Sequence, residues 1–143
     1  MVLRMMADVI ALKPRLVHIM AGTNDVAGNT GTITIAQSCD NLQMMAMLAR
    51  SADIRVLMAS VPPADGFPWR PGLATVEPIR AINRWVDGYC RSGAATFVDY
   101  TPALATPAGA MRPGLAYDGV HPSEAGYDAM AEVLTPVLKA NRA

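Results

Sequence analysis

The chain has 143 residues and a mass of 15.2 kDa, which allows one compact domain over residues 1–143 and leaves no room for two. Its 12 basic and 12 acidic residues cancel, and this argues against a partner that is nucleic acid or an acidic membrane surface. Hydrophobic residues make up 52% of the chain and charged residues 17%, so a sizeable core can form and disorder is excluded. The two cysteines, Cys39 and Cys90, are too few for a disulfide scaffold.

The first expected element is a helix over residues 1–12, with Leu3, Met6 and Ile10 at helical spacing. Pro14 ends it, because proline disfavours helical backbone in the residue before it. The helix is too short and too charged to resemble a signal peptide or a membrane span. As it stands, the sequence therefore predicts a cytoplasmic protein.

Apolar strands and amphipathic helices are expected to alternate over the rest of the chain. The strands are short apolar runs of the kind buried on both faces of a parallel sheet, over residues 16–21, 54–60 and 96–100. Helices are expected over residues 35–50, from Pro78, and after the N-cap Ser123. Their apolar faces are Cys39, Leu42, Ala46 and Ala49; Ile79, Ile82, Val86 and Tyr89; and Tyr127, Met130, Leu134 and Val137.

This alternation is typical of an α/β domain with a parallel sheet. Ligands bind such sheets outside the carboxyl ends of the strands, so the loops that follow the strands are the ones of functional interest. They cover residues 22–31, 62–75 and 101–122.

Two of these loops carry side chains suited to chemistry. Asp118 precedes His121 by three residues, so its carboxylate can accept a hydrogen bond from Nδ1 and leave Nε2 free as a base. Asn24, after the first strand, offers an amide donor that could stabilise an oxyanion. Either cluster alone is also explained by turn chemistry, but both are expected at the same edge of the sheet.

The segment 17–25, with Gly22-Thr23-Asn24-Asp25, resembles block III of the SGNH (GDSL-type) hydrolases, and Asp118-Gly119-Val120-His121-Pro122 resembles their block V. The resemblance implies a flavodoxin-like α/β/α sandwich that hydrolyses short-chain acyl esters with a serine nucleophile and no cofactor or metal. In that family His121 would be the general base, Asp118 its orienting partner and Asn24 the oxyanion donor. Gly22, Thr23, Ser60 and Trp69 are expected to line the substrate site.

The sequence departs from the family in its nucleophile, because it contains no Gly-Asp-Ser and no block II glycine. We therefore expect a family member that lacks the first two strands, and secretion is possible if an upstream segment is missing. Ser60 is the only serine expected at the catalytic edge, although a place in the pocket floor is the simpler interpretation of it.

Two other functions compete with an esterase. One is a catalytically incomplete fragment that acts as a binding or assembly unit. The other is a metal-dependent phosphoesterase using Asn24, Asp25, Asp118 and His121, which is disfavoured because such centres usually gather several histidines.

The loop with Phe67, Trp69 and Arg70 either lines an acyl or sugar pocket or covers the sheet edge. An apolar strand over residues 16–21 left at a sheet edge also predicts a homo-oligomer.

Overall fold

The computed structural model describes residues 1–29 and 31–141, and a parallel sheet lies at its centre. In the described residues the sheet has the strands β1 (Leu16–Ile19), β2 (Arg55–Ala59) and β3 (Thr96–Val98), in the order β1-β2-β3. Val17 lies opposite Val56, and Met58 lies opposite Phe97. All three strands run in the same direction, so their carboxyl ends meet at one edge of the sheet.

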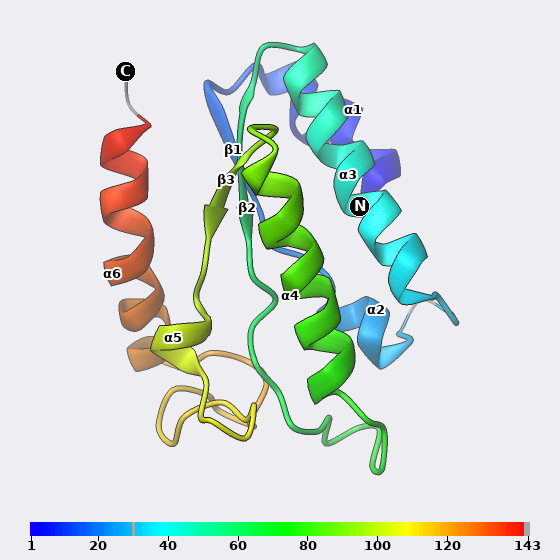
Figure 1. The fold of residues 1–143 in the computed structure, drawn as a ribbon, viewed down its shortest axis with the longest axis vertical. Coiled ribbons are helices and arrows are strands. Elements are labelled where there is room, and N and C mark those ends of the chain that lie inside the picture. The colour runs from blue at the N-terminus through cyan, green and yellow to red at the C-terminus, as the bar shows by residue number, and fades with distance from the viewer. Residues whose placement is uncertain (30, 142–143) are drawn as a thin grey trace.

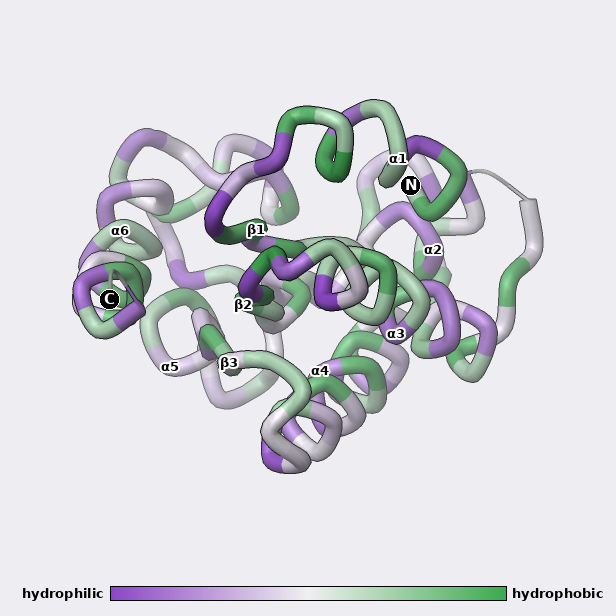
Figure 2. The backbone as a smooth tube through the Cα atoms, turned by 90° about the horizontal axis from the view of Figure 1, so that it is seen from above, coloured by the Kyte–Doolittle hydropathy of each residue, from purple (hydrophilic) through white to green (hydrophobic). Residues whose placement is uncertain are grey.

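Helices cover both faces of this sheet (Figures 1 and 2). The long helices α3 (Ile35–Ser51) and α4 (Val76–Arg91) lie on one face, while α5 (Thr101–Leu104) and α6 (Glu124–Ala140) lie on the other. This is the flavodoxin-like three-layer α/β/α sandwich that the sequence predicts. None of the helices in residues 1–29 and 31–141 is long and apolar enough to cross a bilayer.

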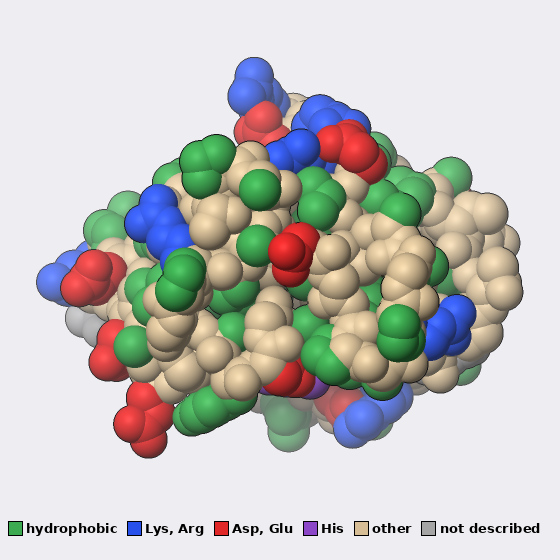
Figure 3. All heavy atoms as spheres, turned by 90° about the horizontal axis from the view of Figure 1, so that it is seen from below, with side chains coloured by type: hydrophobic (Ala, Val, Ile, Leu, Met, Phe, Trp, Pro, Cys, Tyr) green, Lys and Arg blue, Asp and Glu red, His purple; other side chains and the backbone are tan. Residues whose placement is uncertain are grey.

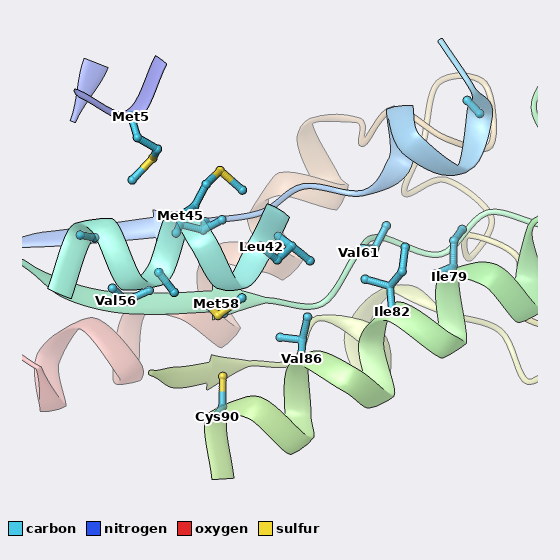
Figure 4. Packing of buried hydrophobic residues seen from close by; sticks show 14 of the residues in the cluster. Met5, Leu42, Met45, Val56, Met58, Val61, Ile79, Ile82, Val86 and Cys90 are labelled. Atoms are coloured by element: carbon cyan, nitrogen blue, oxygen red, sulfur yellow. The ribbon is translucent and has the colours of Figure 1, made fainter. Parts of the chain in front are cut away.

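Two apolar clusters hold the layers together, one on each side of the sheet. In the larger cluster, Leu42 and Met45 of α3 and Ile82 and Val86 of α4 pack around Met58 of β2 (Figure 4). The predicted apolar face of α3 is buried as expected. A capping box at Thr34 begins this helix, since Thr34 Oγ1 accepts from the Gln37 N–H and the Gln37 side chain accepts from the Thr34 N–H.

The N-terminal segment is helical but its predicted apolar face is wrong. It consists of three short pieces, η1 (Val2–Arg4), α1 (Met5–Asp8) and η2 (Ile10–Leu12), which pack against α3. Met5 is buried, whereas Leu3 is 98% exposed. The segment changes from a 3-10 helix to an α-helix at Met5 and is interrupted again by the non-helical backbone of Val9 (φ −127°, ψ −62°), so the periodicity of one continuous helix does not apply.

Two more expectations need correction. The segment 22–31 contains a short helix, α2 (Thr23–Ala27), where the glycines predict only a loop. On α6, Met130 is buried as expected, but Tyr127 is 58% exposed and lines a cavity instead of packing in the core. Both differences lie at the carboxyl edge of the sheet, where the candidate site is found.

Candidate active site

The turn that contains Asp118 and His121 is closed by three hydrogen bonds to one carboxylate. Asp118 Oδ2 lies 2.7 Å from Nδ1 of His121, while Oδ1 accepts the backbone N–H of Val120 at 3.0 Å and that of His121 at 2.8 Å. Because the carboxylate accepts from Nδ1–H, the imidazole keeps Nε2 as its basic nitrogen. The geometry is that of an oriented general base.

The same hydrogen bonds keep Asp118 ionised. Those from the backbone N–H and the imidazole of His121, with a smaller contribution from Val120, lower the pKa of the Asp118 carboxyl from 3.8 to about 2. Asp118 therefore carries its negative charge at any pH where an esterase works, and it can stabilise the imidazolium that forms when His121 takes up a proton.

The start of α6 anchors this turn. Ser123 caps the helix by accepting the Gly126 N–H at 3.3 Å, and its hydroxyl donates to the Gly114 carbonyl at 2.7 Å. The His121 carbonyl also accepts the Tyr117 N–H at 2.9 Å. Hydrogen bonds thus hold the backbone on both sides of His121, although 66% of the His121 side chain is exposed.

Asn24 is placed by α2, which starts directly after β1. Gly22 caps the helix with φ of +135°, and a Cβ at that position would lie 2.7 Å from Cγ2 of the buried Val61, so only glycine fits there. Oδ1 of Asn24 accepts a hydrogen bond from Nδ2 of Asn29 at 2.8 Å. The opposite side of the amide, Nδ2, carries the two protons that an oxyanion could use.

Asn24 and His121 line one cavity of about 390 Å³ at the carboxyl edge of the sheet. Gly22 and Thr23, the residues expected to bind substrate, line it too, together with Asp25. Apolar side chains from α3 and from the loops also form its wall, among them Met20, Leu42, Met45, Pro62 and Val120. Seen from this end, hydrophobic and uncharged side chains cover most of the surface, and the Lys and Arg side chains lie toward its periphery (Figure 3). The structure thus brings together the two loop clusters that the sequence singles out.

Ser60 does not lie in this cavity. Its side chain is fully buried, and its Oγ accepts the Tyr100 N–H at 2.8 Å, while its own N–H donates to the Val98 carbonyl. Ser60 thus extends the pairing between β2 and β3 beyond the strands and ties down the segment after β3. The geometry therefore gives no support to the expected place of Ser60 in the substrate site, because the residue faces the neighbouring strand rather than the open edge.

Ser38, a residue of α3 that the sequence analysis does not single out, also lines the cavity. It is buried on α3, and its Oγ has no hydrogen-bond partner among the described residues. The signal was present in the sequence, because Ser38 shares a helix face with Leu42 and Met45, four and seven residues further on.

Trp69 lies against His121, with ring centroids 5.7 Å apart and planes inclined by 35°. The buried Phe67 stacks on Trp69 at 5.2 Å, and Trp69 Nε1 donates to Asn29 Oδ1 at 3.2 Å. Trp69 therefore belongs to the site, but as a neighbour of the base rather than as part of the cavity wall.

The second histidine, His18, is separate from this arrangement. It lies on β1, where its Nε2 is 3.1 Å from the Tyr100 hydroxyl, and burial lowers its pKa. Within residues 1–29 and 31–141, no three His, Cys, Asp or Glu side chains gather in a way that could hold a metal ion. The metal-dependent alternative thus has no ligand set in this part of the chain.

Residues 1–129 match the model of the GDSL-like lipase/acylhydrolase family. The chain belongs to this family. A GDSL-like lipase from Bacteroides thetaiotaomicron has a similar structure, with 38% sequence identity and a TM-score of 0.92 over 97% of this chain and 69% of that one. An acylhydrolase of Bacteroides fragilis is similar at 33% identity and a TM-score of 0.93, over 99% of this chain and 69% of that one.

More distant solved structures share the fold. An acetylxylan esterase from Geobacillus stearothermophilus matches at 23% identity and a TM-score of 0.72, over 94% of this chain and 64% of its own length. A comparison with curated proteins gives no match. The family and the fold support ester hydrolysis as the general activity.

Proposed function

We propose that the site hydrolyses short-chain acyl esters by a serine-type mechanism, with His121 as the general base, Asp118 as its orienting carboxylate and Asn24 as an oxyanion donor. The observation that carries the proposal is the shared cavity, which places an Asp-oriented imidazole and an amide donor around the same space. These are two of the three components that acyl transfer needs.

In the proposed mechanism, each of the three residues has one role. Nε2 of His121 takes the proton of a serine hydroxyl while the serine oxygen attacks the ester carbonyl. The carbonyl oxygen becomes an oxyanion that accepts from Nδ2 of Asn24, and Asp118 stabilises the imidazolium. The intermediate collapses, the bond to the alkoxy oxygen breaks, and His121 returns the proton to the leaving alcohol. Water, deprotonated by His121 in turn, then attacks the acyl-serine; the bond to the serine oxygen breaks, His121 returns the proton to that oxygen, and the acid is released.

Whether this chain supplies a nucleophile decides between ester hydrolysis and a binding or assembly unit. Four of the five serine hydroxyls are engaged elsewhere: Ser51, Ser92 and Ser123 donate to backbone carbonyls, and Ser60 accepts from the Tyr100 N–H. The fifth, Ser38, lines the cavity, and its hydroxyl has no partner among the described residues. In the described part of the chain, none of these five hydroxyls is hydrogen-bonded to His121. A binding or assembly unit that keeps the cavity but lacks turnover is therefore the second candidate.

The cavity favours a small, uncharged acyl group. Its volume of about 390 Å³ lies at the lower end of the range for small-molecule sites, and Met20, Leu42 and Met45 give it an apolar wall. Acetyl esters are the natural first choice for an assay, since one structural neighbour is named an acetylxylan esterase.

The test is hydrolysis of p-nitrophenyl acetate by the purified chain, before and after treatment with a serine-directed organophosphonate and with a chelator. We expect hydrolysis that the organophosphonate abolishes and the chelator leaves unchanged, and mass spectrometry of the adduct identifies the serine. Loss of activity with the chelator alone would contradict the proposal. A folded chain that binds the ester without hydrolysing it would establish the binding unit instead.

A further inference from the structure

Three side chains form a chain of hydrogen bonds that ends at Asn24. Nε1–H of Trp69 donates to Oδ1 of Asn29 at 3.2 Å, and Nδ2–H of Asn29 donates to Oδ1 of Asn24 at 2.8 Å. Trp69 comes from the loop after β2, forty residues away from Asn29, so the contact joins two loops at the carboxyl edge of the sheet.

The direction of this chain is fixed by the first donor. An indole N–H can only donate, so the amide of Asn29 must turn its oxygen toward Trp69. Its nitrogen then faces Asn24, and Asn24 must present its oxygen to accept from it. Since an amide carries its oxygen and nitrogen on opposite sides, Nδ2 of Asn24 is left for an acceptor other than Asn29. Trp69 thus determines, through Asn29, that Oδ1 of Asn24 faces Asn29 and that Nδ2 of Asn24 remains available to donate elsewhere.

The end of α2 brings Asn29 back onto Asn24. Gly28 has left-handed backbone (φ +67°), its N–H donates to the Asp25 carbonyl at 3.0 Å, and the Asn29 N–H donates to the Asn24 carbonyl at 3.0 Å. This pair of bonds is a Schellman motif, which Gly28 allows because it has no Cβ. The short helix therefore ends with its Asn29 side chain beside the Asn24 side chain.

Trp69 also touches the other half of the site. Its ring lies 5.7 Å from that of His121, and it is held from behind by Phe67, which is only 2% exposed. The Arg70 N–H donates to the Phe67 carbonyl at 2.9 Å, which closes the turn that carries the indole. Because Phe67 already stacks on the indole, Trp69 is better placed to hold its neighbours than to offer a free platform to a sugar ring.

We propose that Trp69 and Asn29 are positioning residues: they orient the Asn24 amide so that it can donate to the oxyanion, and Trp69 packs the ring of His121 on the other side of the cavity. The catalytic consequence rests on the proposed function, whereas the orientation of Asn24 does not. Neither Asn29 nor Trp69 contacts the reacting atoms, and both act through Asn24 and His121.

Asn29→Asp is the sharpest perturbation, because a carboxylate can still accept from Trp69 but cannot donate to Asn24. The Asn24 amide is then expected to turn over and donate Nδ2–H to the new carboxylate, which takes it away from the oxyanion. Trp69→Phe removes the indole N–H but keeps a ring beside His121. Trp85→Phe is the matched control, since Trp85 stacks on Tyr89 of α4, outside the network and the cavity.

The first readout is NMR of the side-chain amides, with the Asn24 signals assigned by their loss in Asn24→Asp. We expect the Nδ2 resonances of Asn24 to move strongly in Asn29→Asp, to move in Trp69→Phe and to stay in place in Trp85→Phe. If they stay in place in Asn29→Asp, the network does not orient Asn24 and the proposal is overturned. This readout needs no turnover.

The second readout is the division between kcat and KM for p-nitrophenyl acetate. Asn29→Asp should lower kcat on the order of 10²–10³-fold with little change in KM, as when an oxyanion donor is lost. Trp69→Phe should cost roughly two- to fivefold, since one hydrogen bond worth about 1 kcal/mol no longer biases the amide. Unchanged kcat in Asn29→Asp, in a wild type that hydrolyses the ester, would also overturn the proposal. If the wild type hydrolyses no ester, the proposed function fails, and the NMR result decides the network by itself.

Discussion

Replacing Asn24 separates two roles that its position allows, an oxyanion donor and a local link in the turn after α2. Asn24→Ala removes both, because it deletes Nδ2 and also Oδ1, which accepts from Asn29. Asn24→Asp removes only the donor, since a carboxylate oxygen can still accept from Asn29. The pair of variants therefore distinguishes catalysis from turn stability.

The two roles differ in magnitude. The hydrogen bond from Asn29 lies at the exposed rim of the site, so its loss in Asn24→Ala should cost about 0.5–1.5 kcal/mol of unfolding free energy. Loss of an oxyanion donor costs about 2.7–4 kcal/mol in the transition state, or roughly 10²–10³ in kcat. The catalytic effect should therefore exceed the stability effect clearly, and Asn24→Asp should show it with near-normal stability.

The assay combines urea unfolding with kcat and KM for p-nitrophenyl acetate, expressed per folded molecule. We expect both variants to lose kcat by roughly 10²–10³-fold with little change in KM, and only Asn24→Ala to lose measurable stability. The reasoning is refuted if Asn24→Asp turns over like the wild type, because the role of Asn24 would then be confined to the turn.

Four further results are expected. Asp118→Asn should lower kcat on the order of 10³–10⁴-fold by favouring the wrong imidazole tautomer, and a wild-type kcat would contradict the role of Asp118. Because hydrogen bonds hold the pKa of Asp118 at about 2, below its ordinary 3.8, the stability they add is complete above about pH 4 and lost as the pH falls toward 2. In urea unfolding, the wild type should therefore exceed Asp118→Asn in free energy of unfolding by less at pH 2.5 than at pH 6. A difference that stays constant over this range would contradict the stabilising role of the ionised Asp118 carboxylate. Gly22→Ala should lower the free energy of unfolding by at least about 2 kcal/mol, because alanine is strained at φ +135° and its Cβ would clash with the buried Val61. An unchanged free energy of unfolding would show that α2 can shift to make room. Finally, β1 lies at an edge of the sheet in the described residues, so we expect self-association in sedimentation at micromolar concentration, and a clean 15.2 kDa monomer would exclude it.

The layered fold was predictable because its signals are local and repeated. Apolar runs mark the strands, and residues such as Leu42 and Ile82 fall at helical spacing on the buried faces of α3 and α4. Prediction failed where tertiary contacts override the local pattern. Met5, not Leu3, is buried, because the segment is not one continuous helix and η1 and α1 pack on α3 through a different face.

The site was predictable where its parts are close in sequence. Asp118 and His121 are three residues apart, and their hydrogen bond follows from that spacing. The contact between Trp69 and Asn29 spans forty residues, so no local pattern indicates it. For Ser60, the sequence predicts the position at the end of a strand correctly, but not the direction of the side chain. That direction follows from the hydrogen bond with the Tyr100 N–H beyond the next strand.

The most direct test of the account is the turnover of His121→Ala compared with His18→Gln, the variant of the other histidine. His121 lines the cavity and is oriented by Asp118, while His18 lies on β1 beside Tyr100 and outside the cavity. We predict that His121→Ala, folded as judged by urea unfolding, loses hydrolysis of p-nitrophenyl acetate to the level of buffer, whereas His18→Gln keeps the wild-type kcat per folded molecule. Wild-type turnover by His121→Ala would contradict the central claim that this cavity is an ester-hydrolysing site.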